Sequence, residues 1–172
     1  MTTVNLKPNE YHEFYSTYIN KVPKELELIA GFIKGGAHLI QFFKELPADK
    51  LEYRYAEGKW SIKEVLQHII DTERVFMYRC FRIARRDKTP LAGFEQDDYI
   101  NPSQGHNKAL KALLEEYEVG RKNAIVLLKS LGNEDLQYIG KASGCNMSAR
   151  AIAFATIGHE LHHIDILKER YL

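Results

Sequence analysis

The sequence predicts an all-α protein, and more specifically a four-helix bundle with at least one long crossover connection. Four long stretches of the 172 residues place hydrophobic side chains at the spacing of an amphipathic helix, and almost nothing alternates with period two. The segment between the second and third stretches is long enough to run from one end of a bundle to the other. The length is typical of one domain, so we expect residues 1–172 to form a single unit.

The first long helix is expected from about Val22 to Leu46. Pro23 would occupy its first turn, where a missing N–H costs nothing, and Pro47 would end it. Its hydrophobic stripe consists of Leu26, Ile29, Ile33, Ile40 and Phe43. A shorter amphipathic piece, about residues 9–19, is expected to precede it.

The second helix has the clearest start signal in the sequence. In the tetrapeptide SIKE, Ser61 can accept a hydrogen bond from the backbone N–H of Glu64, whose side chain can bind back to the backbone of the serine. From this capping box the hydrophobic spacing continues to about Arg86, which predicts a helix over residues 61–86.

The connection that follows, residues 87–106, contains two prolines and two glycines. Loops of this length are uncommon inside compact domains and tend to be lids or crossovers, and a crossover would let the next helix lie parallel to the second. The third helix is expected from about Asn107 to Leu131, with Gly132 at its end, and the fourth from about Asn146 to Leu172.

Composition and charge argue against several classes of function. A net charge of +1 offers no strongly basic surface for nucleic acid or an anionic membrane. The two cysteines, Cys80 and Cys145, cannot build a disulfide framework, and the N-terminus shows no signal peptide. No apolar run approaches the length of a membrane span. We therefore expect a cytoplasmic protein that binds neither nucleic acid nor membrane.

The C-terminal segment HELHH, residues 159–163, matches the H-E-x-x-H pattern of many zinc peptidases. On a helix, His159 and His163 lie one turn apart and differ by about 40° around the axis, so both imidazoles can reach one ion. His162 is three residues from His159 and lies about 100° around the helix from His163, so only one of the pairs His159–His163 and His159–His162 is expected to bind the ion. The spacing of four residues is the better-attested one. The pattern therefore predicts two metal ligands, His159 and His163.

A zinc peptidase needs a third protein ligand, which the common arrangements supply downstream of the motif. Only nine residues follow His163, and none of them is a histidine. Asp165 would lie roughly 160° around the helix, and Glu169 is more than a turn away and off the ligand face. We therefore reject the peptidase interpretation, and a third ligand has to come from another helix.

His68 is the candidate for that third ligand. It follows the Ser61 cap by two turns and shares a helix face with Val65, which predicts that it points into the bundle. The alternative from the residues alone is a neutral histidine that is hydrogen-bonded within the bundle or half exposed at a helix seam.

At these positions the chain resembles a known family. Residues 60–73, WSIKEVLQHIIDTE, are similar to the W-S-x-x-E-x-x-x-H segment of the DinB/YfiT-like superfamily, and His159-x-x-x-His163 is similar to that family's closing pair of ligands. The loop RRDKTPLAGFEQDDYI also resembles the loop after the second helix in DinB-like members. The likeness spans essentially the whole chain, although it is sharp only in these three places.

This resemblance implies an up-down-down-up four-helix bundle with its long crossover between helices two and three, and it implies a homodimer. It further implies one divalent metal ion held by three histidines, which correspond to His68, His159 and His163. Three imidazoles leave one or more positions for water or substrate, as in catalytic zinc sites. Zinc and nickel are the first candidates for the ion, and iron, manganese and copper stay open as alternatives.

Two carboxylates close to these histidines, Asp71 and Glu160, are hypothesised to act beside the metal. Asp71 follows His68 by three residues, and Glu160 follows His159 directly. Either could orient an imidazole N–H or take a proton from bound water. The alternative is that both are ordinary solvated or salt-bridged carboxylates.

In families that the chain resembles, the bundle supports transfer of a low-molecular-weight thiol to an electrophile and thiol-dependent isomerisation of maleylpyruvate. The first functional hypothesis is therefore a metal-dependent enzyme of thiol transferase or hydrolase type. Its substrate would be a small molecule, with low-molecular-weight thiols among the candidates. The alternative is a non-enzymatic, stress-associated bundle in which the metal stabilises the fold or is sensed.

Overall fold

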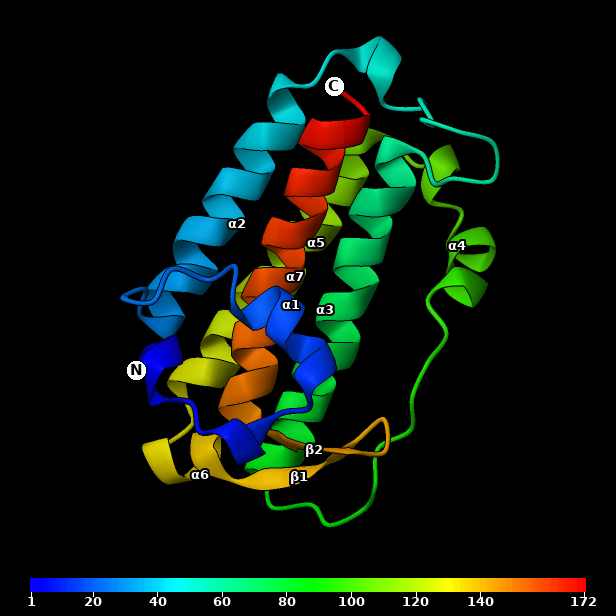
Figure 1. The fold of residues 1–172 in the computed structure, drawn as a ribbon. Coiled ribbons are helices and arrows are strands. Elements are labelled where there is room, and N and C mark those ends of the chain that lie inside the picture. The colour runs from blue at the N-terminus through cyan, green and yellow to red at the C-terminus, as the bar shows by residue number, and fades with distance from the viewer.

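The computed structural model describes residues 1–172 and consists mainly of α-helices (Figure 1). The helices are α1 (Ser16–Ile19), α2 (Leu28–Glu45), α3 (Ile62–Ala84), α4 (Asp97–Ser103), α5 (Leu110–Lys129), α6 (Asn133–Gln137) and α7 (Ala149–Arg170). Two strands, β1 (Ile139–Ala142) and β2 (Cys145–Ser148), lie between α6 and α7. Single 3₁₀ turns cover Thr3–Asn5, Pro8–Glu10, Glu13–Tyr15, Ala48–Lys50 and Gly105–Asn107.

The four long helices form a bundle whose order along the chain is up-down-down-up. In Figure 1, α2 and α7 run upward, whereas α3 and α5 run downward. The parallel pair α3 and α5 is joined by residues 85–109, which climb the outside of the bundle and include α4. The predicted fold class and the long crossover are therefore confirmed.

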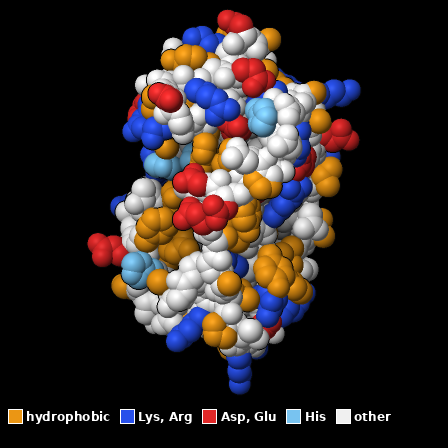
Figure 2. All heavy atoms as spheres, turned by 90° about the vertical axis from the view of Figure 1, so that its right-hand side faces the viewer, with side chains coloured by type: hydrophobic (Ala, Val, Ile, Leu, Met, Phe, Trp, Pro, Cys, Tyr) orange, Lys and Arg blue, Asp and Glu red, His pale blue; other side chains and the backbone are white.

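The surface over this crossover carries no large patch of one charge. Figure 2 views the molecule from that side, and basic, acidic and hydrophobic side chains are interspersed across it. The mixture agrees with the net charge of +1. None of the helices combines the length and the hydrophobicity that a membrane crossing requires.

Helix α3 begins at the predicted capping box. Ser61 Oγ accepts a hydrogen bond from the Glu64 N–H at 3.3 Å, and the Ser61 N–H donates to Glu64 Oε2 at 2.7 Å. The Glu64 carboxylate also forms an ion pair with Arg54, which ties the helix start to the preceding loop. The first residue of α3 is thereby fixed, and with it the height of His68 in the bundle.

The first long helix is shorter than the sequence predicts, because α2 begins at Leu28 and not at Val22. Residues 23–26 form a separate turn, closed by the Leu26 N–H on the Pro23 carbonyl. The Leu28 N–H then donates to the carbonyl of Met1, so the N-terminus supplies the partner of an early helix N–H. The predicted piece over residues 9–19 is likewise not one helix but two 3₁₀ turns followed by α1.

The fourth helix also begins later than predicted, because a β-hairpin precedes it. β1 and β2 pair antiparallel through the turn residues Ser143 and Gly144, which both have positive φ (51° and 76°). Positive φ at both central residues is typical of a type I′ turn, whose twist matches that of the two flanking strands. Ser148 ends β2 and caps α7, since its Oγ accepts a hydrogen bond from the Ala151 N–H at 3.1 Å. Gly132, predicted to end the third helix, instead precedes the first residue of α6.

The segment before α1 is anchored to the start of α7 through Glu10. The buried Glu10 carboxylate accepts hydrogen bonds from Ser148 Oγ and from Arg150 Nε, both at 2.7 Å. Burial by itself would raise the pKa of Glu10, but these hydrogen bonds lower it below its usual value. Glu10 therefore holds the N-terminal segment against the bundle as a charged group.

Two hydrophobic clusters fill the bundle, and a layer of polar side chains lies where they meet. On α7, Ile157 belongs to one cluster and Ile164 to the other; on α5, Ala124 and Tyr117 divide in the same way. We call the polar side chains between the clusters the polar layer, which comprises His68, Thr72, Glu73, Arg121, His159, Glu160 and His163. All of the sequence-predicted metal ligands lie in it.

Helix α1 lies directly against α7 at Gly158. A Cβ atom added to this glycine would lie 2.0 Å from the backbone oxygen of Tyr18, far inside van der Waals contact. Because that oxygen belongs to the backbone, it cannot move aside as a flexible side chain would.

We expect Gly158→Ala to lower the free energy of unfolding by about 1–3 kcal/mol, since α1 would have to shift away from α7. Urea denaturation monitored by circular dichroism measures this change. Gly120→Ala on α5 is the matched control, because the space around Gly120 is open. That substitution should instead raise stability by about 0.5–1 kcal/mol. Equal stability of wild type and Gly158→Ala would contradict the close approach of α1.

Candidate metal centre

Three histidines from two antiparallel helices converge at the polar layer. His68 extends from α3, while His159 and His163 extend from neighbouring turns of α7. The Nε2 atom of His68 lies 2.9 Å from that of His159 and 3.1 Å from that of His163, and the last two are 3.1 Å apart. All three side chains thus present the same ring nitrogen to one small space.

This arrangement fits a bound metal ion better than it fits a set of hydrogen bonds. A tetrahedral ion about 2.0–2.1 Å from each of three nitrogens holds them about 3.3 Å apart, which is close to the observed spacing. An N–H that points at the common centre is aimed at neither of the neighbouring nitrogens, so hydrogen bonds would be poorly directed. Three converging imidazole nitrogens are a donor set that divalent transition metals accept.

The protein environment keeps these imidazoles neutral. Burial lowers the pKa of His68 to about 4, with the nearby His162 acting in the same direction. Burial also lowers the pKa of His159 and His163 far below the usual value, and the neighbouring histidines add to the effect. At neutral pH each ring therefore offers an unprotonated nitrogen, which metal binding requires.

Aromatic side chains enclose the cluster. The Trp60 ring lies 4.8 Å from the His68 ring between centroids, and the Tyr18 ring lies 5.2 Å from that of His159. His162 is outside the cluster and instead contacts Tyr18, with ring centroids 5.4 Å apart. The structure thus places the His162 side chain away from the point where the other three histidines converge.

Two cavities reach the cluster, and the long crossover borders both. One has a volume of about 510 Å³ and is lined by His159, Thr72 and Phe94 among others. The other, of about 270 Å³, is lined by His163, Trp60, Asp97 and seven further residues. A small molecule could therefore approach the three nitrogens beneath residues 94–97 of the crossover.

The two carboxylates predicted to act beside the metal form other contacts. Asp71 Oδ1 accepts hydrogen bonds from Gln67 and Arg74, both at 3.1 Å, on the side of α3 that faces α5. Glu160 Oε2 accepts hydrogen bonds from Tyr117 and Arg121. Neither carboxylate hydrogen-bonds one of the three histidines, so the structure offers no contact through which either would orient an imidazole.

Glu160 is part of a buried ionic cluster that the sequence did not lead us to expect. Arg121 Nη2 donates to Glu73 Oε2 at 2.7 Å and to Glu160 Oε2 at 2.5 Å, and all three side chains are buried. Burial raises the pKa of Glu73, and Arg121 only partly opposes this effect. The cluster joins α3, α5 and α7, with Glu160 directly after His159 and Glu73 five residues after His68.

Two adjacent glycines on α2 make room for this cluster. A Cβ atom at Gly35 would lie 2.9 Å from Glu160 Oε1, and one at Gly36 would lie 3.1 Å from Arg121 Cγ. The glycine pair in the middle of a predicted amphipathic helix was the available sequence signal for a close neighbour. The identity of that neighbour could not be read from it.

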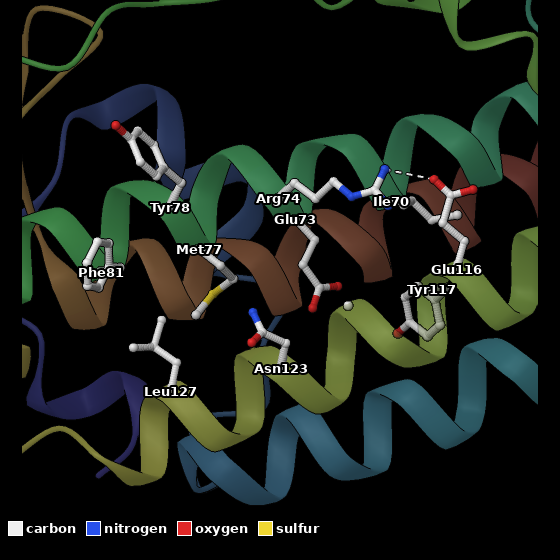
Figure 3. A pocket seen from close by; sticks show the side chains of 11 residues that line it. Ile70, Glu73, Arg74, Met77, Tyr78, Phe81, Glu116, Tyr117, Asn123 and Leu127 are labelled. Carbon is white, nitrogen blue, oxygen red and sulfur yellow. Dashed lines mark hydrogen bonds and ion pairs between the residues drawn. The ribbon is translucent and has the colours of Figure 1, made fainter.

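A separate cavity of about 280 Å³ lies between α3 and α5 and contains none of the histidines. Figure 3 shows Glu73 and Tyr117 pointing into it from opposite helices, with Arg74 paired to Glu116 at one end. Met77 and other hydrophobic side chains line the remainder. This cavity meets the ionic cluster, whereas the two cavities beside the histidines meet the candidate metal centre.

Comparison with known proteins places this chain in a family. The model of the DinB superfamily matches residues 32–167, which contain α3 and α5 entirely and all of α2 and α7 except the first residues of α2 and the last residues of α7. The chain belongs to the DinB superfamily. The resemblance recognised in the sequence is therefore confirmed.

Among proteins similar to this DinB-superfamily chain is one from Bacillus licheniformis, whose name assigns it a predicted metal-dependent hydrolase activity. It is 24% identical over 149 residues, which cover 84% of each chain. YfiT from Bacillus subtilis, described as a four-helix bundle of unusual topology, superposes with a TM-score of 0.73 at 16% identity, over 86% of this chain and 89% of YfiT. The mycothiol-dependent maleylpyruvate isomerase superposes with a TM-score of 0.65 at 14% identity, over 86% of this chain and 62% of the isomerase.

We expect Arg121→Ala to lower the free energy of unfolding by about 3–5 kcal/mol, because it leaves two buried carboxylates without their cation. Lys122→Ala is the matched control, since Lys122 forms an exposed ion pair with Glu118 one turn away. Its effect should stay within about 0.5 kcal/mol. Urea denaturation of both variants checks the comparison, and similar small losses would show that the ionic cluster contributes little.

Proposed function

We propose that the chain binds one divalent metal ion through Nε2 of His68, His159 and His163 and acts as a metal-dependent enzyme on a small molecule. The observation that carries this proposal is the convergence of three neutral imidazole nitrogens within 3.1 Å of one another. Cavities on two sides of the cluster give a substrate access to the same point. Three protein ligands would leave a position open for water or substrate.

A divalent ion at this position supplies Lewis-acid chemistry, which lowers the pKa of a bound water or thiol. The protein's own residues contribute position and environment. Trp60 and Tyr18 shield the imidazoles from bulk water, which strengthens electrostatic interactions at the site. The ionic cluster of Glu73, Arg121 and Glu160 holds α3, α5 and α7 together just beside the ligands.

The reaction class is proposed from the site together with the relatives. The Bacillus licheniformis relative is named for hydrolysis, and one structural neighbour is a mycothiol-dependent isomerase. Both descriptions are compatible with an open position that takes water in one case and a thiol in the other. We propose thiol transfer or hydrolysis on a small molecule, with zinc or nickel as the first candidates for the ion.

The position of the histidines also favours a second candidate function. An ion bound there would join α3 to α7 in the middle of the bundle, so it would stabilise the folded chain whether or not a reaction follows. This supports a non-enzymatic metal-binding bundle as the alternative. Metal binding tests both functions, and turnover separates them.

We expect the purified protein to contain about one divalent metal ion per chain, and His68→Ala and His163→Ala to lose most of it, because each removes one of three ligands. Inductively coupled plasma mass spectrometry measures the content. His162→Ala is the matched control, since His162 lies on the same helix outside the cluster. Full occupancy in His68→Ala or His163→Ala would contradict the three-histidine site.

Chelation should lower the thermal midpoint of the wild type and of His162→Ala but leave that of His163→Ala unchanged, because only a site that binds metal loses stabilisation. Differential scanning calorimetry with and without EDTA measures the shift. Metal-loaded protein is then assayed with bacterial thiols plus an electrophile, and with ester and amide substrates. A chelator-sensitive midpoint without turnover in any assay would favour the non-enzymatic bundle.

A further inference from the structure

The larger cavity beside the histidines has a second polar end. It has a volume of about 510 Å³, within the range of roughly 300–1,000 Å³ that holds small ligands. His159 and Thr72 line it near the proposed metal centre, and the aromatic rings of Phe76 and Phe94 line its walls. Arg79 also lines this cavity.

His68 and Arg79 stand on the same face of α3. They are 11 residues apart in sequence, which is about three helical turns and about 16 Å along the axis. Thr72 and Phe76, which lie between them in the sequence, line the cavity as well. The cavity therefore extends along α3 from the histidines to Arg79.

Arg79 is a buried arginine without a carboxylate partner. The chain buries three arginines; Arg121 is paired with Glu73 and Glu160, and Arg150 is paired with Glu10. Arg79 is only 3% exposed, yet no carboxylate lies within 4.0 Å of it. A buried charge without a counter-ion is costly, so a bound anion would stabilise the Arg79 guanidinium.

Part of the Arg79 guanidinium is occupied by the protein and part is free. Nη2 donates to the Ala92 carbonyl at 2.7 Å and to Ser143 Oγ at 3.0 Å, while the Phe94 ring covers one face. The Tyr15 side chain, which lines the same cavity, lies close to the guanidinium, whose remaining N–H groups are on Nε and Nη1. Because Arg79 lines the cavity, their three N–H groups are available to a ligand there.

The other groups near Arg79 do not neutralise it. Burial lowers the pKa of Arg79, and the Tyr15 and Tyr99 side chains partly oppose this effect. Glu95 lines the same cavity but is exposed and beyond ion-pair distance of Arg79. The guanidinium therefore keeps its positive charge at a largely aromatic wall.

We propose that Arg79 is an anion-binding subsite of this cavity, and that the substrate carries a carboxylate at the end remote from the three histidines. One guanidinium balances one negative charge, and the N–H groups that Ala92 and Ser143 leave free can donate to the oxygens of a carboxylate. The substrate is then an elongated small molecule with an anionic end, a part that packs against aromatic rings and a reactive group at the histidines. This inference rests on the proposed function for the reactive end only.

The test compares three probes of the same shape and different charge: 4-phenylbutyrate, 4-phenylbutanol and 4-phenylbutylamine. Isothermal titration calorimetry is performed on full-length protein treated with EDTA, so that no carboxylate binds through a metal. Wild type should bind the carboxylate roughly tenfold or more tightly than the alcohol, since a charge-assisted hydrogen bond is stronger than a neutral one. The amine should bind most weakly, because it places a second cation beside Arg79.

Arg79→Gln should bind the carboxylate and the alcohol about equally, and Arg79→Lys should keep part of the preference because it keeps the charge. Arg82→Gln is the matched control on the same helix. Arg82 is paired with Asp87 and lies outside the cavity, so its removal should leave the preference at the wild-type value. Circular dichroism confirms that each variant is folded.

Arg79 also links the crossover to the β-hairpin, and a purely structural role would weaken binding of all three probes in Arg79→Gln without changing their ratio. That result would overturn the anion subsite. So would equal affinities, or no binding of any probe, in the wild type. If the carboxylate preference behaves as expected while the untreated protein holds no metal, the anion subsite stands and the proposed metal-dependent function fails.

Discussion

The polar layer across the middle of the bundle is the constraint on which the rest of the structure depends. Three unprotonated imidazole nitrogens within 3.1 Å of one another repel, and two carboxylates sharing Arg121 are costly to bury. Neither arrangement persists unless the surrounding helices hold it. The hydrophobic clusters on either side provide that support, because each packs the same four helices together.

The close backbone approaches are a consequence of this layer. Gly35 and Gly36 on α2 leave space for Glu160 and Arg121, and Gly158 lets α1 lie on α7. Through the last contact Tyr18 reaches His159, so the N-terminal segment becomes a wall of the candidate metal centre. Small residues at these positions therefore serve the site as much as the packing of the bundle.

The crossover borders both cavities beside the three histidines. Because α3 and α5 are parallel, residues 85–109 must travel the length of the bundle, and they pass over the cavities on the way. Phe94 and Asp97 line these cavities, and the Ala92 carbonyl holds one edge of Arg79. In the two proposals taken together, the histidines and Arg79 bind opposite ends of one elongated substrate.

Local patterns in the sequence determined the helices, the capping box at Ser61 and the one-turn spacing of His159 and His163, because these features depend on residues a few positions apart. The β-hairpin was not predicted, because its strands are short and only the Ser143-Gly144 turn marks them in the sequence. Which side chains meet across the bundle was decided by tertiary packing. The family resemblance suggested that His68 meets His159 and His163. No local pattern in the sequence indicated the ionic cluster around Arg121 or the lack of a carboxylate partner for Arg79. A buried charge is recognised by the groups around it, and those groups come from helices distant in sequence.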